Sequence, residues 1–103
     1  MIEENNIFPI RSDFEQIKKQ NESGSEYWTS RDLCVALGYS TYQKFTRTIN
    51  KAIAIASHKR LNIADHFNHM VEMVKLGSGS IRKVENIHLS RMACLIIAEN
   101  ADG

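Results

Sequence analysis

The longest periodic pattern of apolar residues runs through the middle of the chain and predicts one long helix. Apolar side chains recur every three or four residues, at Tyr42, Phe45, Ile49, Ile53 and Ala56. This spacing places them on one face of an α-helix. We expect the helix to extend from about residue 41 to residue 58, with the Ser40 hydroxyl capping its first turn.

The chain before this helix predicts two shorter helices. Ser12 and Glu15 match an S-x-x-E capping box, in which the two side chains each bond the other residue's backbone amide. Thr29 caps a second helix, which we expect to end at Gly38 because glycine readily adopts the positive φ of a helix C-terminus. Between them, Glu26–Trp28 is rich in strand-forming residues and predicts a short strand.

The chain after the long helix predicts a hairpin and a final helix. Residues 62–76 fit both helical and strand spacing. We expect a short helix or turn near Asp65, then a β-hairpin around Gly77–Ser80 with residues 81–88 as its second strand. Residues 91–98 predict a mostly buried helix. Together these elements predict an α+β fold, a small single domain of three to four helices with a short antiparallel hairpin or sheet.

Length and composition fit one small domain. The chain has 103 residues, of which 43% are hydrophobic and 24% are charged, as in ordinary globular proteins. No apolar run approaches the ~20 residues of a membrane span, and the polar N-terminus is unlike a secretory signal. Cys34 and Cys94 lack disulfide-scaffold or zinc-site spacing, so we expect buried, reduced thiols in a cytoplasmic protein. We expect residues 1–11 to be flexible.

Charge is segregated along the chain, although the net charge is only +1. Residues 1–30 hold three basic and six acidic side chains, and residues 61–103 hold four basic and five acidic ones. Residues 31–60 hold six basic side chains and a single acidic one. An asymmetry of this kind indicates an anionic partner.

Basic residues of this middle segment and of the predicted hairpin form a candidate nucleic-acid-binding site. Three of them fall on the polar side of the long helix, where they are placed to contact phosphates. The full candidate set is Lys44, Arg47, Lys51, Lys59, Arg60, Lys75, Arg82 and Lys83. Neutral donors nearby are Thr46, Thr48 and Asn50. An ordinary explanation also stands, because lysines normally line solvated helix faces and cations at a helix C-terminus complement its dipole.

Other chemistry has little support in the sequence. His66 and His69 stand three residues apart, but no third ligand has matching spacing, which favours a surface or turn pair over a metal site. The Gly77–Ser80 loop lacks the flanking residues of a P-loop and indicates a plain hairpin turn. The acidic residues show no paired arrangement for acid–base catalysis. We therefore expect no enzymatic activity, no metal and no cofactor.

Several groups of residues, taken in order, resemble one bacterial family. The groups are Phe14–Lys18, Glu26–Leu33, Leu37–Phe45, Asp65–Phe67, Met73–Val74, Leu76–Gly79 and Leu89–Cys94. Each group is short, but the ordered set resembles the start of the DNA-damage-inducible protein D family and extends from about residue 14 to residue 102. The same region is similar to the N-terminal domain of the BRO and phage antirepressor proteins, which are associated with DNA binding.

The resemblance implies a small α+β domain that acts in the bacterial response to DNA damage, without catalysis or cofactor. The family's chain continues past the stretch matched here by Asn100, Ala101 and Asp102, into further helical sequence. The family supplies no agreed set of binding residues, so the candidate set rests on the charge argument.

Two functions follow as hypotheses. The first is a non-catalytic DNA-binding module whose partner is DNA. The second is a protein-interaction module that docks on a DNA repair or recombination protein. Ile55 favours the second, because helical spacing places this apolar side chain on the polar, exposed side of the long helix.

Overall fold

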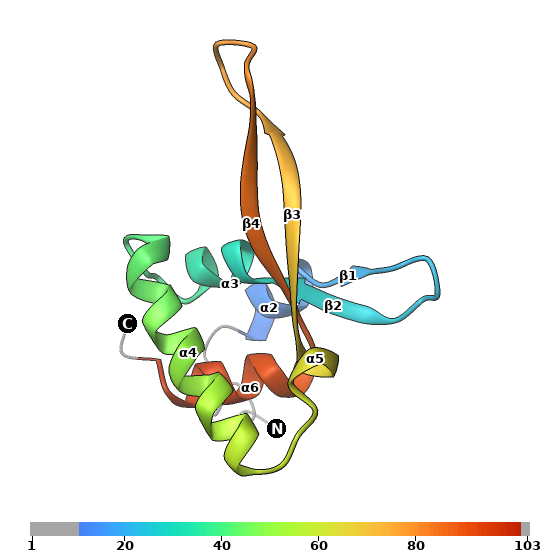
Figure 1. Cartoon of the computed structure of the whole chain (residues 1–103), viewed down its shortest axis with the longest axis vertical. Coiled ribbons are helices and arrows are strands. Elements are labelled where there is room, and N and C mark those ends of the chain that lie inside the picture. The colour runs from blue at the N-terminus through green and yellow to red at the C-terminus, as the bar shows by residue number, and fades with distance from the viewer. Residues whose placement is uncertain (1–10, 102–103) are drawn as a thin grey trace.

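Helices and strands mix along the chain in a computed structural model that describes residues 11–101 (Figure 1). The elements are α2 (Arg11–Gln16), β1 (Lys19–Gln20), β2 (Glu26–Thr29), α3 (Ser30–Ala36), α4 (Tyr42–His58), α5 (Ile63–His66), β3 (Phe67–Lys75), β4 (Ile81–Leu89) and α6 (Arg91–Glu99). The predicted α+β class is confirmed. The described residues hold five helices, one more than the upper end of the prediction.

The four strands form one antiparallel sheet in the order β1-β2-β4-β3. β2 pairs only with the last two residues of β4, at Leu89 and His88, whereas β3 pairs with all nine. The outer part of β3 and β4 is therefore a two-stranded ribbon, which projects from the rest of the molecule (Figure 1). We call residues 71–85 of this ribbon the arm.

The core lies where the helices meet the base of the sheet. α4 packs against α6, α3 and α5, and its buried stripe includes Phe45, Ile49 and Ala56. Trp28 is fully buried; its indole stacks on Phe14 with 4.3 Å between ring centroids and donates a 2.8 Å hydrogen bond to the Phe14 carbonyl. The core joins α2, the sheet and the long helix, so the face of α4 that carries cations points outward.

Cys34 and Cys94 are free thiols buried in this core, as predicted. Burial disfavours the thiolate and raises the pKa of both thiols. Among the described helices, none is long and apolar enough to cross a bilayer.

Two predictions about element boundaries are corrected, and a third stays a prediction. Thr41, not Ser40, caps α4, because its side chain accepts the Lys44 amide. α2 begins at Arg11, so Ser12 lies inside the first turn and not before it. The sequence predicts that residues 1–11 are flexible. Apart from Arg11, these residues lie outside the described part of the chain.

The sheet is also larger than predicted. Its hairpin has nine-residue strands, because the segment from Phe67 onward, which fits both helix and strand spacing, is extended throughout. Lys19–Gln20 forms a further strand in a region whose polar residues indicate only a loop. The turn at Gly77–Ser80 and the short helix near Asp65 are confirmed.

α3 and α4 end in the same way but with different residues. The residue after each C-cap is in the left-handed region, Gly38 at φ 83° and Arg60 at φ 64°. In both helices, two backbone amides that follow the C-cap donate hydrogen bonds to carbonyls of the last turn. One of these bonds runs from Gly38 to Val35 in α3, and the equivalent bond in α4 runs from Arg60 to Ser57. This is the Schellman motif, and glycine fills the left-handed position without strain whereas arginine does not.

The two left-handed positions predict opposite stability changes. Gly38→Ala should lower the free energy of unfolding by about 1 kcal/mol through backbone strain, since a Cβ there meets no atom within 4 Å. Arg60→Gly should raise it by about 1 kcal/mol, and Arg60→Gln, which keeps a side chain, should not. Urea unfolding of the three variants measures both effects. Equal stability of Arg60→Gly and Arg60→Gln would contradict the account.

Candidate nucleic-acid interface

The described basic side chains divide into a paired set and an unpaired set. Lys18, Lys19 and Arg91 form ion pairs with acidic side chains, and Arg31 donates to the Glu85 carbonyl. Within the described part of the chain, the other basic side chains have neither an ion pair nor a hydrogen bond. These are Lys44, Arg47, Lys51, Lys59, Arg60, Lys75, Arg82 and Lys83, which are the eight predicted site residues.

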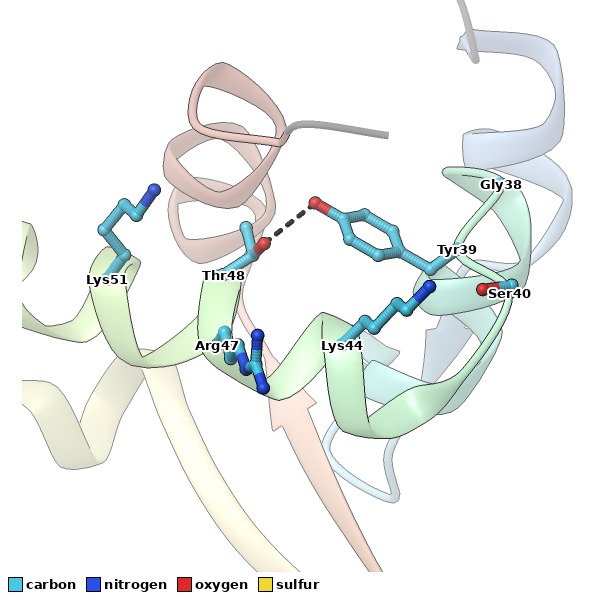
Figure 2. A pocket seen from close by; sticks show the side chains of 7 residues that line it. All are labelled: Gly38, Tyr39, Ser40, Lys44, Arg47, Thr48 and Lys51. Atoms are coloured by element: carbon cyan, nitrogen blue, oxygen red, sulfur yellow. Dashed lines mark hydrogen bonds between the residues drawn. The ribbon is translucent and has the colours of Figure 1, made fainter.

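Three of the eight surround a depression beside the first half of α4 (Figure 2). Lys44, Arg47 and Lys51 are exposed and lie at successive turns of the helix. The depression measures about 570 Å³ and is also lined by residues 38–40, which link α3 to α4, and by Thr48. It is a concave, positively charged surface of the kind that accepts phosphate oxygens.

Hydroxyl groups complete this depression. The Tyr39 hydroxyl lies 2.8 Å from Thr48 Oγ1, a contact that joins the α3–α4 link to the helix (Figure 2). Ser40 also lines the depression. Thr41 takes the capping role that the sequence assigns to Ser40, so the Ser40 hydroxyl is not the cap of α4. One sequence signal could have identified Ser40 as a site residue: it lies just before a helix that carries cations in its first turns.

Two of the expected neutral donors have other roles. Thr48 is buried and bonded to Tyr39, and Thr46 Oγ1 donates to the Gln43 carbonyl at 2.6 Å. Asn50 is exposed on α4.

Helix stability does not explain the cations at the start of α4. Lys44 lies in the first turn, where the helix dipole disfavours positive charge. That turn has no acidic residue, and residues 33–64 contain none at all. An acidic residue in this turn would stabilise a helix whose face contacts only water. The presence of a cation there instead favours the binding of an external anion.

Lys59 and Arg60 lie at the opposite end of α4, about 22 Å along the helix from Lys44. Here the dipole favours cations, so their position has a structural explanation as well. Lys59 and Lys51 border a second, shallow hollow of about 470 Å³ that Ile55 also lines. Ile55 is only partly exposed and packs against the core, so the expectation of an exposed apolar residue is wrong.

The last three candidates lie on the arm. Lys75 ends β3, and Arg82 and Lys83 follow Ile81, the first residue of β4, so all three flank the outer turn. The hairpin projects away from the helices and does not extend the α4 surface directly (Figure 1). The structure therefore groups the eight cations at three places: the start of α4, its end, and the arm.

A buried polar network fixes the base of the arm to α4. Ser30 Oγ donates to Asn86 Oδ1 at 2.9 Å and lies 2.7 Å from the Tyr42 hydroxyl at the start of α4. Asn86 Nδ2 donates to Glu72 at 3.1 Å, where the arm begins. Ser30 is 0% exposed and Asn86 5% exposed, so their hydrogen bonds have no competing water.

The same network lowers the pKa of Glu72. The Asn86 amide is the main cause, and His88 adds a hydrogen bond and a charge. A lowered carboxyl pKa stabilises the fold above the ordinary value of 4.5, and this stabilisation is lost as the pH falls through the lowered value.

The two histidines considered as metal ligands lie in different elements. His66 ends α5 and its Nδ1 lies 2.6 Å from Ser90 Oγ, whereas His69 lies on β3 and its Nδ1 lies 3.6 Å from Glu85. Across the described residues, no group of three or more His, Cys, Asp or Glu residues is placed to hold a metal ion.

Loss of the Asn86 amide should loosen the arm. Asn86→Ala leaves the Ser30 hydroxyl and the Arg31 amide without their buried acceptor, which should cost about 2 kcal/mol of unfolding free energy. The control is Asn68→Ala on exposed β3, which should change stability by less than about 0.5 kcal/mol. Urea unfolding measures both. A cost for Asn86→Ala no larger than the control's would show that the network does not hold the arm.

Comparison with known proteins identifies a relative. The chain is 39% identical over 89 residues to DNA damage-inducible protein D of Escherichia coli (strain K12), and the match covers 86% of this chain and 32% of that protein. No protein-family model matches the chain, and no solved structure is significantly similar to it. The similarity to BRO and antirepressor proteins stays a prediction. The relationship that the ordered motifs indicate is confirmed: the chain is a relative of DNA damage-inducible protein D and spans about a third of its length.

Proposed function

We propose that this chain is a non-catalytic DNA-binding module that acts in the bacterial response to DNA damage. The observation that carries the proposal is the division of the basic side chains. Those that stabilise the fold have acidic or carbonyl partners, whereas eight exposed cations have none among the described residues. The name of the relative, which refers to DNA damage, supports the biological setting.

The proposed contact is with the phosphate backbone. Lys44, Arg47 and Lys51 supply the charge at the depression on α4, and the Ser40 hydroxyl adds a neutral donor. Such contacts release condensed counterions and do not read bases, so they give affinity and position with little sequence preference.

The spread of the cations favours a polymer over a small anion. The molecule is 46 Å in its longest dimension, and unpaired cations occur at both ends of α4 and on the projecting arm. A single phosphate could occupy only one of these places. A duplex, which carries one charge per ~1.7 Å of its axis, offers an anion to each.

A protein-interaction module is the second candidate, and one observation favours it. Met92 and Leu95 lie one turn apart on α6, and each is nearly half exposed. Neighbouring exposed apolar side chains suit contact with another protein, for which a DNA repair or recombination protein is the expected partner.

Salt dependence separates the two candidates. If Lys44, Arg47 and Lys51 each contact a phosphate, their share of the log–log salt slope is about −0.9 × 3, or about −2.7, for duplex DNA. That share weakens binding about fortyfold between 50 and 200 mM salt. Replacing all three with Gln should remove it without unfolding the protein, because these side chains are exposed and Gln is a good helix former. Fluorescence anisotropy at several salt concentrations measures the slope.

The matched control replaces two cations that already have acidic partners. Lys18→Gln with Lys19→Gln should change the slope much less, because both lysines are engaged with Glu15, Glu26 or Asp32. An unchanged slope in the triple variant would show that the cations of α4 contact only solvent. The protein-interaction module would then become the leading candidate.

A further inference from the structure

The arm exposes apolar and basic side chains together. Val71, Met73 and Ile81 are 67%, 62% and 64% exposed, which is unusual for large apolar residues. Residues 73–84 contain three cations and no acid. Below the arm, β4 pairs with β2 and is covered by the core, but the arm itself is a ribbon of only two strands. Such a ribbon is marginally stable alone in water, so a partner surface would stabilise it.

The register of the ribbon places its side chains on two faces. Val71 is opposite Glu85, Met73 is opposite Lys83, and Lys75 is opposite Ile81, so these six side chains share one face. Val74 is opposite Arg82, and this pair lies on the other face. The first face, which we call the apolar face, therefore holds three apolar side chains, two lysines on different strands and, at its base, Glu85.

This arrangement argues against pairing of two arms. The outer part of this face, beyond Glu85, holds two lysines and no acid, so a second copy stacked on it would bring cations against cations, which repel each other. A partner that covers the apolar face must also supply negative charge along both edges of the ribbon, beside Lys75 on β3 and Lys83 on β4.

We propose that the arm enters the major groove of duplex DNA, an inference that rests on the proposed function. The groove, ~12 Å wide, admits a two-stranded β-ribbon and has a phosphate backbone along each wall. With the apolar face toward the floor, β3 runs along one wall and β4 along the other, so Lys75 and Lys83 each bring a cation to a different wall. Val71, Met73 and Ile81 then face the floor of the groove, where thymine methyl groups are the apolar feature.

The arm thus provides a contact that the α4 depression lacks. Phosphate contacts at α4 hold the duplex without regard to sequence, and the arm adds a preference for steps that display thymine methyl groups. The network around Asn86 sets the direction in which the arm leaves the domain relative to α4.

Replacement of thymine by uracil tests this inference directly, because it removes only the methyl group. We expect the chain to bind a thymine-containing duplex more tightly than the same duplex with uracil, by about fourfold for each methyl group that the arm covers. The variant Val71→Thr, Met73→Gln, Ile81→Thr changes the size of the exposed side chains by at most one non-hydrogen atom and makes each of them polar. It should bind both duplexes equally, at the affinity of the unchanged chain for the uracil duplex.

The matched control is the triple Gln variant at Lys44, Arg47 and Lys51, which should lose affinity for both duplexes and keep their ratio. Equal binding of thymine and uracil duplexes by the unchanged chain would overturn the arm's role and leave DNA binding intact. Displacement of the chain by a minor-groove ligand such as netropsin would also overturn it. Absence of binding to any duplex would overturn the proposed function and this inference together.

Discussion

The hydrogen bonds between Ser30 and Asn86 are the constraint on which the arrangement of the surface depends. These two buried side chains join the start of α3, the start of α4 through Tyr42, and the base of the arm through Glu72. A buried polar pair of this kind contributes little net energy when satisfied but costs much when broken. It therefore specifies one orientation of the ribbon on the helices, and the charged surfaces of α4 and the arm keep a fixed relation to each other.

The distribution of unpaired charge depends on where acidic side chains pair with basic ones. Arg91 bonds Glu15 and Glu26 and lies 5.1 Å from the centre of the Trp28 ring, so it ties α6 to the N-terminal elements. The hydrogen bond from Arg91 is the main reason that the pKa of Glu26 is lowered. The acids that pair with lysine or arginine, Glu15, Glu26 and Asp32, thus lie near β1 and β2. Residues 33–64, which include α4, contain no acid, and neither do residues 73–84 of the arm, so the cations there face solvent or a partner.

Much of the fold could be predicted from local chemistry. The stripe of α4, the Thr29 cap and the positive φ at Gly38 depend on neighbours within a turn and were predicted correctly. The length of the hairpin, strand β1 and the partial burial of Ile55 depend on contacts between distant segments, which periodicity does not show. All eight candidate cations could be named from charge alone. Their separation into three places, and the roles of Tyr39 and Ser40, required the structure.

The central claim is that the unpaired cations, and not the paired ones, face DNA. Amide chemical-shift mapping during titration with a short duplex tests it most directly, because it reports on every part of the chain at once. The account predicts shifts that concentrate in residues 38–51 and in the arm, residues 71–85. It predicts small shifts around Lys18, Lys19 and Arg91, whose charges are already paired. Shifts confined to the paired cations, or to Met92 and Leu95 on α6, would contradict it.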